Sequence, residues 1–97
     1  MAQVAQEHRT KAWIDSDISY LLREWQEIPR VLRQWNDWDE LDRLTFVVEW
    51  PLRTERMARL EYWDGQNELA PDQRERYREL RTLIARYRSD LEQLVAE

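Results

Sequence analysis

Few residues in this chain have the types needed for catalysis or cofactor binding. His8 is the only histidine among 97 residues, and cysteine is absent. A Ser-His-Asp triad, a zinc site and a Glu-x-x-His di-iron site all need such residues on an ordered scaffold. A glycine-rich phosphate loop is excluded because Gly65 is the only glycine. The sequence therefore predicts no catalytic residue, no metal site and no cofactor, and we expect a protein that is not an enzyme.

The 20 acidic residues are the remaining candidates for acid–base chemistry or cation binding. With so many carboxyl groups, accidental pairs are inevitable, and nothing singles out one pair as catalytic. One local cluster lies between Trp35 and Leu44 and contains Asp37, Asp39, Glu40 and Asp42. It lacks the alternating acids, central glycine and distal glutamate of an EF-hand loop. Helix capping and a solvated turn explain this cluster better than a calcium or magnesium site.

The distribution of glycine and proline predicts an all-α fold. Strong breakers occur only at Pro29, Pro51 and the Gly65–Pro71 segment, whereas a β fold would need turn residues every eight to twelve positions. We therefore expect a small helical bundle of three to five helices, with helix breaks near these three places. At Pro29 a kink and a restart are both compatible with the sequence, and we prefer a restart because proline clashes with the carbonyl four residues earlier.

The expected domain organisation is simple. Residues 1–14 have a weak apolar pattern and are predicted to be a weakly ordered N-terminal arm or frayed helix. Residues 15–97 are predicted to be a single helical domain, whose first helix is capped by Asp15-Ser16-Asp17. Gly65 is expected to end a helix in the left-handed conformation, and Pro71 to start the last one after a poor N-cap, Ala70.

The last helix carries the clearest periodic pattern of the chain. Its apolar residues recur at spacings of three and four, at Tyr77, Leu80, Ile84, Tyr87, Leu91 and Leu94. Such a narrow stripe is typical of a coiled-coil-like seam. It favours either packing within the bundle or a homodimer built on residues 77–94, which would need additional packing from residues 41–50.

Residues 41–50 form the most apolar stretch, and their apolar side chains are distributed all around a helix. A helix of this kind is buried on several sides. The stretch is therefore predicted to be the centre of the fold or of an interface.

Arginine is concentrated in the last helix. Residues 74–88 contain six arginines and two glutamates, although the whole chain has a net charge of −5. Guanidinium groups bind phosphates, and interleaved tyrosines can stack on bases. A nucleic-acid-associated regulator is thus an alternative function. Against it, Tyr77 and Tyr87 share their stripe with core leucines, and the acidic net charge disfavours nucleic-acid binding by the whole surface.

Six tryptophans are many for so short a chain. Most are expected to build the core, and the others to serve as interface anchors, because Trp, Tyr and Arg are enriched at binding hot spots. No stretch is long and apolar enough to span a bilayer, and no signal-peptide pattern is present, so a cytoplasmic location is expected.

Together these features favour a non-enzymatic protein–protein interaction module acting through an aromatic-rich helical face. In size, acidity and helicity the chain is similar to many bacterial antitoxins, immunity proteins and small adaptors as a class. An antitoxin-like or regulatory inhibitor or adaptor is the concrete hypothesis, and a self-associating homodimer is its structural variant. The predicted partner-binding residues are Trp35, Trp38, Trp63, Tyr77, Arg81, Tyr87 and Arg88.

Overall fold

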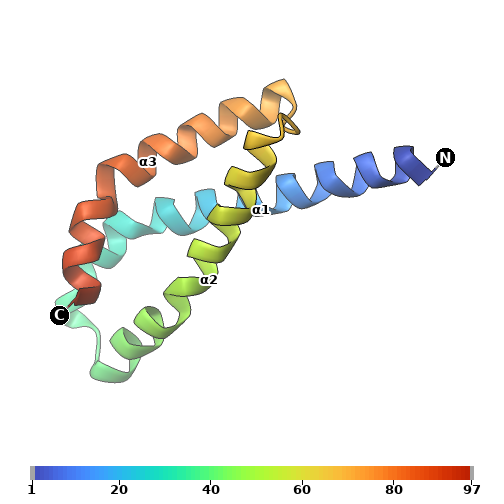
Figure 1. The fold of residues 1–97 in the computed structure, drawn as a ribbon. Coiled ribbons are helices and arrows are strands. Elements are labelled where there is room, and N and C mark those ends of the chain that lie inside the picture. Colours follow the sequence, from blue (N-terminus) through green and yellow to red (C-terminus); the bar gives the residue numbers. More distant parts are fainter. Residues whose placement is uncertain (1, 97) are drawn as a thin grey trace.

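The computed structural model describes the backbone of residues 2–96 and the side chains of residues 9–96. The described backbone forms three α-helices, α1 (Ala2–Gln34), α2 (Glu40–Gly65) and α3 (Pro71–Ala96), with a 3₁₀ turn, η1 (Trp35–Asp37), between the first two (Figure 1). The all-α prediction is confirmed, as is the helix break between Gly65 and Pro71.

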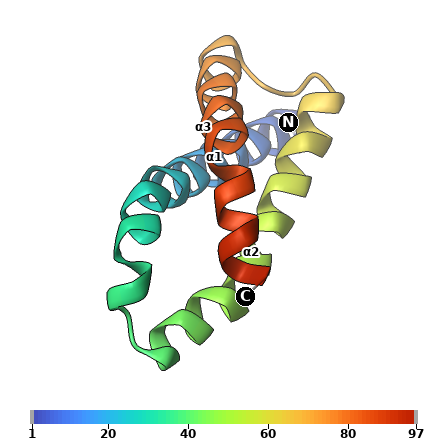
Figure 2. The same cartoon turned by 90° about the vertical axis from the view of Figure 1, so that its left-hand side faces the viewer.

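The predicted breaks at Pro29 and Pro51 are wrong, because α1 and α2 run through these prolines. A proline inside a helix removes a hydrogen bond and crowds the preceding turn, at a cost of about 3 kcal/mol. Around Pro29 this cost is offset by packing, since Ile28 and Val31 are both buried. Figure 2 shows that α1 and α2 each change direction along their length, so each is a bent helix rather than two separate ones.

The predicted helix start at Asp15-Ser16-Asp17 is also wrong, because α1 begins at Ala2. Asp17 lies in the middle of the buried face of α1 and is 1% exposed. Arg59 on α2 donates to its two carboxylate oxygens, from Nε at 2.8 Å and from Nη2 at 2.6 Å. The Nη1 atom of Arg56 lies 3.7 Å from the same carboxylate, so Asp17 is not a cap but joins α1 to two arginines of α2. The predicted weakly ordered arm spans residues 1–14. The side chains of residues 1–8 lie outside the described part of the chain, and for them this stays a prediction.

The core is organised around α1. Its fully buried residues Ile14, Ile18, Leu21 and Ile28 form one stripe, against which both α2 and α3 pack. From α3 the stripe is covered by Leu80 and Leu91, and from α2 by Leu60. The three helices form an elongated body of 53 × 23 × 17 Å, in which α1 is the common support.

The periodic pattern of the last helix is confirmed as the core-facing side of α3. Tyr77, Leu80 and Leu91 are buried, and Ile84, Tyr87 and Leu94 are half-buried against the same core. The seam predicted for a homodimer is therefore used within one chain.

The start of α3 is fixed by a buried glutamine. Ala70 has no side-chain acceptor, but the Oε1 atom of Gln73 accepts a hydrogen bond from the Ala70 N–H at 2.9 Å, as the third residue does in a capping box. The Nε2 group of Gln73 donates to Asp15 Oδ1 at 2.7 Å and to the Lys11 carbonyl at 3.2 Å. Gln73 is fully buried, so it both caps α3 and ties it to α1.

The turn between α2 and α3 does not use glycine as expected. Gly65 is the last residue of α2 and has a negative φ, whereas Asn67 has a φ of 58°. Asparagine tolerates this left-handed conformation better than most residues. The N–H groups of Gln66 and Glu68 donate to carbonyls in the last turn of α2, which closes the helix without a left-handed glycine.

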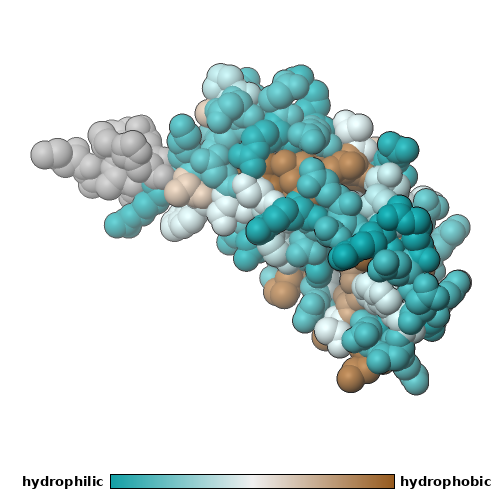
Figure 3. All heavy atoms as spheres, turned by 180° about the vertical axis from the view of Figure 1, so that it is seen from behind, coloured by the Kyte–Doolittle hydropathy of each residue, from teal (hydrophilic) through white to brown (hydrophobic). Residues whose placement is uncertain are grey.

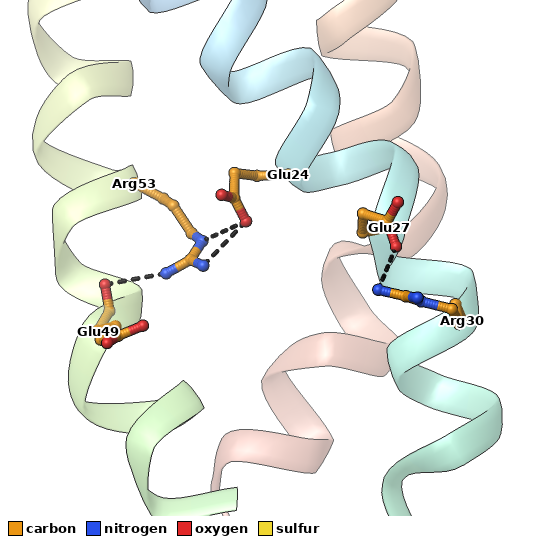
Figure 4. Close-up of polar contacts among 5 residues, drawn as sticks. All are labelled: Glu24, Glu27, Arg30, Glu49 and Arg53. Carbon is orange, nitrogen blue, oxygen red and sulfur yellow. Dashed lines mark hydrogen bonds and ion pairs between the residues drawn. The ribbon is translucent and has the colours of Figure 1, made fainter. Parts of the chain in front are cut away.

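A second polar contact holds α2 to α1. Arg53 is buried, and its Nε and Nη2 groups donate to Glu24 Oε2 at 3.2 and 2.9 Å, while Nη1 donates to the Glu49 carbonyl at 3.0 Å (Figure 4). The neighbouring Glu27–Arg30 pair in Figure 4 lies within α1 and is more than half exposed. The Arg53–Glu24 contact helps to hold α2 against α1, whereas the exposed Glu27–Arg30 pair contributes little to stability.

No helix among residues 2–96 has an apolar stretch sufficient to cross a membrane.

Replacing Arg59 by methionine is predicted to lower the free energy of unfolding by about 2 kcal/mol, because the buried Asp17 carboxylate then loses its two hydrogen bonds and keeps only Arg56, at 3.7 Å. The D17N/R59M double variant is expected to recover much of this loss, since the buried charge is removed as well. R30M, at the exposed pair, is the control, with a loss below about 0.5 kcal/mol. Urea denaturation followed by circular dichroism measures all three. Equal losses for R59M and R30M would contradict the structural role of the buried pair.

Candidate interaction surface

The first half of α2 exposes a continuous row of large apolar side chains. Leu41, Leu44, Val48 and Leu52 are 70%, 57%, 66% and 54% exposed, and they recur at spacings of three, four and four residues. Residues so spaced lie on one side of a helix. We call these four residues the outer stripe. Figure 3 shows apolar residues at the surface along the lower edge of the molecule, which the first half of α2 forms.

The outer stripe lies opposite the side of α2 that packs against the core. Phe46, Trp50 and Met57 pack against the core, and each lies about half a helical turn from the outer stripe, at 100° per residue. Together, the inner row and the outer stripe explain why the apolar residues between positions 41 and 50 are distributed all around the helix. Their placement at the centre of the fold is wrong, since α2 meets α1 with one face and leaves the other in solvent. The alternative, the centre of an interface, stays a prediction.

A chain of aromatic rings supports the outer stripe from within. Trp50 contacts Trp25 of α1 edge-on at 5.3 Å between ring centroids and stacks on Phe46 at 5.6 Å. Phe46 in turn meets Trp35 at 5.7 Å, and Trp35 meets Trp38 at 5.7 Å. Rings in such contact add stability beyond the area they bury. The exposed row is therefore carried by a firmly packed part of the helix.

Backbone and side-chain contacts fix the beginning of α2. Asp39 is the N-cap, and its Oδ1 accepts a hydrogen bond from the Asp42 N–H at 2.8 Å. Arg43 donates from Nε to the Trp35 carbonyl at 2.9 Å and from Nη2 to the Asn36 carbonyl at 3.0 Å. The capping role predicted for the acidic cluster is thus confirmed at Asp39. Among residues 9–96, no group of three acidic or histidine side chains is placed to hold a metal ion.

Charge is distributed unevenly along the rims of the outer stripe. Exposed acids flank its first half, at Asp39, Glu40, Asp42 and Glu49. Beyond Leu52 the same helix carries Arg56, whose side chain is 39% exposed, and Arg59, whose side chain is 53% exposed. Both arginines pair with the buried Asp17 of α1, and the exposed Glu55 lies between them and Leu52, so the surface has an apolar centre and a predominantly acidic rim.

The seven predicted partner-binding residues are not gathered on one face. Trp35 and Trp38 come together at the α1–α2 junction, where Trp35 is buried and Trp38 half-buried. Trp63 is half-buried against Tyr62 near the far end of α2, at 5.2 Å between ring centroids. Its Nε1 atom is buried and has no hydrogen-bond partner. Trp35 and Trp38 thus support the outer stripe from its inner side, whereas Trp63 belongs to another part of the molecule.

The four predicted residues of α3 divide between the core and the surface. Tyr77 is buried, and the Arg81 guanidinium lies 5.8 Å from the centre of its ring. Tyr87 is half-buried, and Arg88 is exposed and pairs with Glu92 at 3.1 Å. The sequence pattern identified these residues but could not say that their apolar members serve the core.

The arginines of α3 form a separate, exposed surface. Arg74, Arg78 and Arg81 line a shallow hollow of about 460 Å³ beside Tyr77. Because Tyr77 is 5% exposed, it cannot offer its ring to a base, and contact with nucleic acid would involve the guanidinium groups alone. The nucleic-acid alternative stays a prediction. Stacking of a base on Tyr77, which was part of its motivation, is not possible.

A groove runs between α2 and α3 and has α1 as its floor. It encloses about 360 Å³ and is lined by apolar side chains that include Trp25, Trp50 and Ile84. Arg53 and Arg88 contribute its polar lining together with acidic side chains, so opposite charges neutralise one another there. Its apolar walls include Trp25 and Leu91, which belong to the core.

The sequence reasoning missed the residues of the outer stripe as individual candidates. The sequence does contain a pattern that identifies them. Leu41, Leu44, Val48 and Leu52 recur at spacings of three, four and four, and they fall on the opposite side of a helix from Phe46 and Trp50. The two rows have different surroundings, since one packs against the core and the other is exposed.

No known protein-family model matches this chain, and neither a curated protein nor a solved structure shows significant similarity to it.

Tyr77 is predicted to make the fold sensitive to alkaline pH. Burial raises the pKa of its phenol, the nearby Glu61 and Asp64 carboxylates raise it further, and Arg81 opposes them. The folded state therefore favours the neutral phenol. This contribution is fully present below the unfolded pKa of about 10 and is lost as the pH rises through the higher folded pKa.

The measurement is the free energy of unfolding by urea at pH about 8 and about 11, on either side of the ordinary tyrosine pKa. Y77F keeps the ring but cannot ionise, so it is expected to lose less stability between the two values than the unmodified chain. Y62F, at an exposed tyrosine, is the matched control and should behave like the unmodified chain. An identical alkaline loss in Y77F would show that another group is responsible.

Proposed function

We propose that this chain is a non-enzymatic protein–protein interaction module whose contact surface is the outer stripe of α2. The observation that carries the proposal is the exposure of Leu41, Leu44, Val48 and Leu52 in one row. Scattered apolar residues are normal on a protein surface, but a contiguous patch of a few hundred Å² with a polar rim is typical of an interaction site. The charged rim and the uncharged centre of this surface have the composition expected of an interface.

The rigidity of the surface supports the same proposal. Asp39 caps α2, and Arg53 and Arg59 tie it to Glu24 and Asp17 of α1. A surface that is already ordered before contact loses little conformational entropy on binding. Recognition through an exposed helix face with anchors three and four residues apart is a common mode of polypeptide binding.

The concrete form of the proposal is an antitoxin-like or regulatory inhibitor or adaptor, which acts by covering a surface of another polypeptide. Such an activity needs no catalytic group and no cofactor. It needs an apolar contact row and charges that select the partner, and both are present on α2.

The test is site-specific photocross-linking in cells that produce the protein naturally. Benzoylphenylalanine in place of Leu44 is expected to give a discrete covalent adduct on irradiation, because a bound polypeptide would lie against this position. The same probe in place of Glu79, an exposed residue of α3, is the matched control and should give none. Adducts are detected by immunoblotting and identified by mass spectrometry.

A second variant links the adduct to the apolar contact. V48E, in the chain that carries the probe at position 44, is expected to abolish the adduct, since a carboxylate would be buried without a partner. Absence of any adduct at Leu44, or equal adducts at Leu44 and Glu79, would overturn the proposed function. Circular dichroism of the V48E variant should be unchanged, because Val48 is 66% exposed.

A further inference from the structure

We infer that the segment bound to the outer stripe is a basic amphipathic helix of another protein, with a row of apolar residues between flanks of lysine and arginine. This inference rests on the proposed function and names the kind of partner that its surface fits. Three features of α2 carry it: acids on both flanks of the outer stripe, arginines that are committed to other contacts, and a face that cannot bond an extended backbone.

Acidic side chains flank the outer stripe on both sides. At 100° per residue, Asp42 and Glu49 fall on one flank of α2 and Glu40 falls on the other. Glu55 follows Leu52 within one turn and continues the outer stripe. All four acids are exposed. A helix that covers the apolar row brings its own flanking side chains beside these carboxylates, as the flanking charges of paired helices do.

These four carboxylates are not neutralised within the described part of the chain. The ion pairs formed among residues 9–96 include none of them. The arginines of α2 all contact α1 or η1, namely Arg43, Arg53, Arg56 and Arg59. Lysine or arginine on the flanks of a partner would therefore be attracted, whereas acidic flanks would be repelled. The same charges disfavour an anionic membrane and nucleic acid, which bind to basic surfaces.

The occupant has to satisfy its own backbone. The N–H and C=O groups of α2 bond along the helix, so the outer stripe offers no row of donors and acceptors of the kind that a sheet edge gives to an added strand. An extended segment laid on this face would bury backbone groups without partners. A helix bonds its own backbone, and its side chains at spacings of three and four can pack between those of the outer stripe.

The size of the row sets the expected strength. From Leu41 to Leu52 the outer stripe is about 16 Å long, at 1.5 Å per residue, so about three turns of the bound helix cover it. An apolar patch of a few hundred Å² is below the roughly 800 Å² per partner of a standard interface, and small contacts are typical of transient complexes. We therefore expect reversible binding of a single helix, with a dissociation constant on the order of 10 to 100 μM at low salt.

The test measures binding of two synthetic peptides to the purified chain by fluorescence anisotropy. Each peptide has about 14 residues, leucine at spacings of three and four, and a side-chain staple on its polar face that fixes the helix. One peptide carries lysine on both flanks and the other carries glutamate. At a salt concentration of about 50 mM, the lysine peptide is expected to bind at least about tenfold more tightly, because screening is weak there.

Matched variants separate the rim of the outer stripe from the overall negative charge. E40Q/E49Q removes one acid from each flank and is expected to weaken the lysine peptide about fivefold. E79Q/D90N removes the same charge from exposed positions of α3 and is the control, with a change below about twofold. L44S/V48S removes the apolar contact and should abolish binding of the lysine peptide, while circular dichroism confirms that each variant is folded.

The outcomes distinguish this inference from the proposed function. Equal binding of the two peptides, equal losses in E40Q/E49Q and E79Q/D90N, or unchanged binding to L44S/V48S would each overturn the basic helix as occupant. In all three cases a photocross-link at Leu44 would still identify the segment that does bind, and the proposed function would survive. Absence of that photocross-link would overturn the proposed function and this inference together, whatever the peptides do.

Discussion

Burial of the apolar stripe of α1 is the interaction on which the rest of the structure depends. Ile14, Ile18, Leu21 and Ile28 are almost fully removed from water, and the helices that cover them come from both later parts of the chain. At roughly 25 cal/mol per Å² of apolar surface, this burial is the largest favourable contribution available to so small a protein. It also keeps α1 continuous across Pro29, since a break would separate Ile28 from Val31 and Trp35 on the same face.

Because α1 supports the core, one side of α2 is buried and the other is exposed. α2 packs against α1 with one side only. Ion pairs of Arg59 with Asp17 and of Arg53 with Glu24 hold that side in place. The remaining side is apolar in its first half, where a solvent-facing helix is normally polar. Nothing in the stability of the single chain requires leucine or valine at those positions. The packing of the single chain does not account for the composition of this side, and this motivates the proposed interaction surface.

The sequence was sufficient to predict the helical class, the loop between Gly65 and Pro71, the cap at Asp39 and the core-facing stripe of α3. These depend on local chemistry or on a simple period. It was insufficient at Pro29 and Pro51, because the local cost of proline was outweighed by packing that only the folded chain provides. Asp17 was misassigned for a related reason: a short acid is a good cap in isolation, and its partner Arg59 lies 42 residues away in sequence. For the candidate site, the apolar character of residues 41–50 was visible, but which side faced inward depended on how α2 crosses α1.

The attachment of α3 to the first half of α1 has a consequence for synthesis on the ribosome. Gln73 contacts Lys11 and Asp15 across about sixty residues of sequence, and Leu80 and Leu91 follow still later. The part of the α1 stripe that α3 covers therefore emerges early and stays uncovered until almost the whole chain has been made. Exposed apolar helices in nascent chains are what chaperones bind and what aggregates when they are absent. Expression yield of this protein should thus depend on how quickly translation reaches α3, a constraint set by topology and independent of the stability of the finished fold.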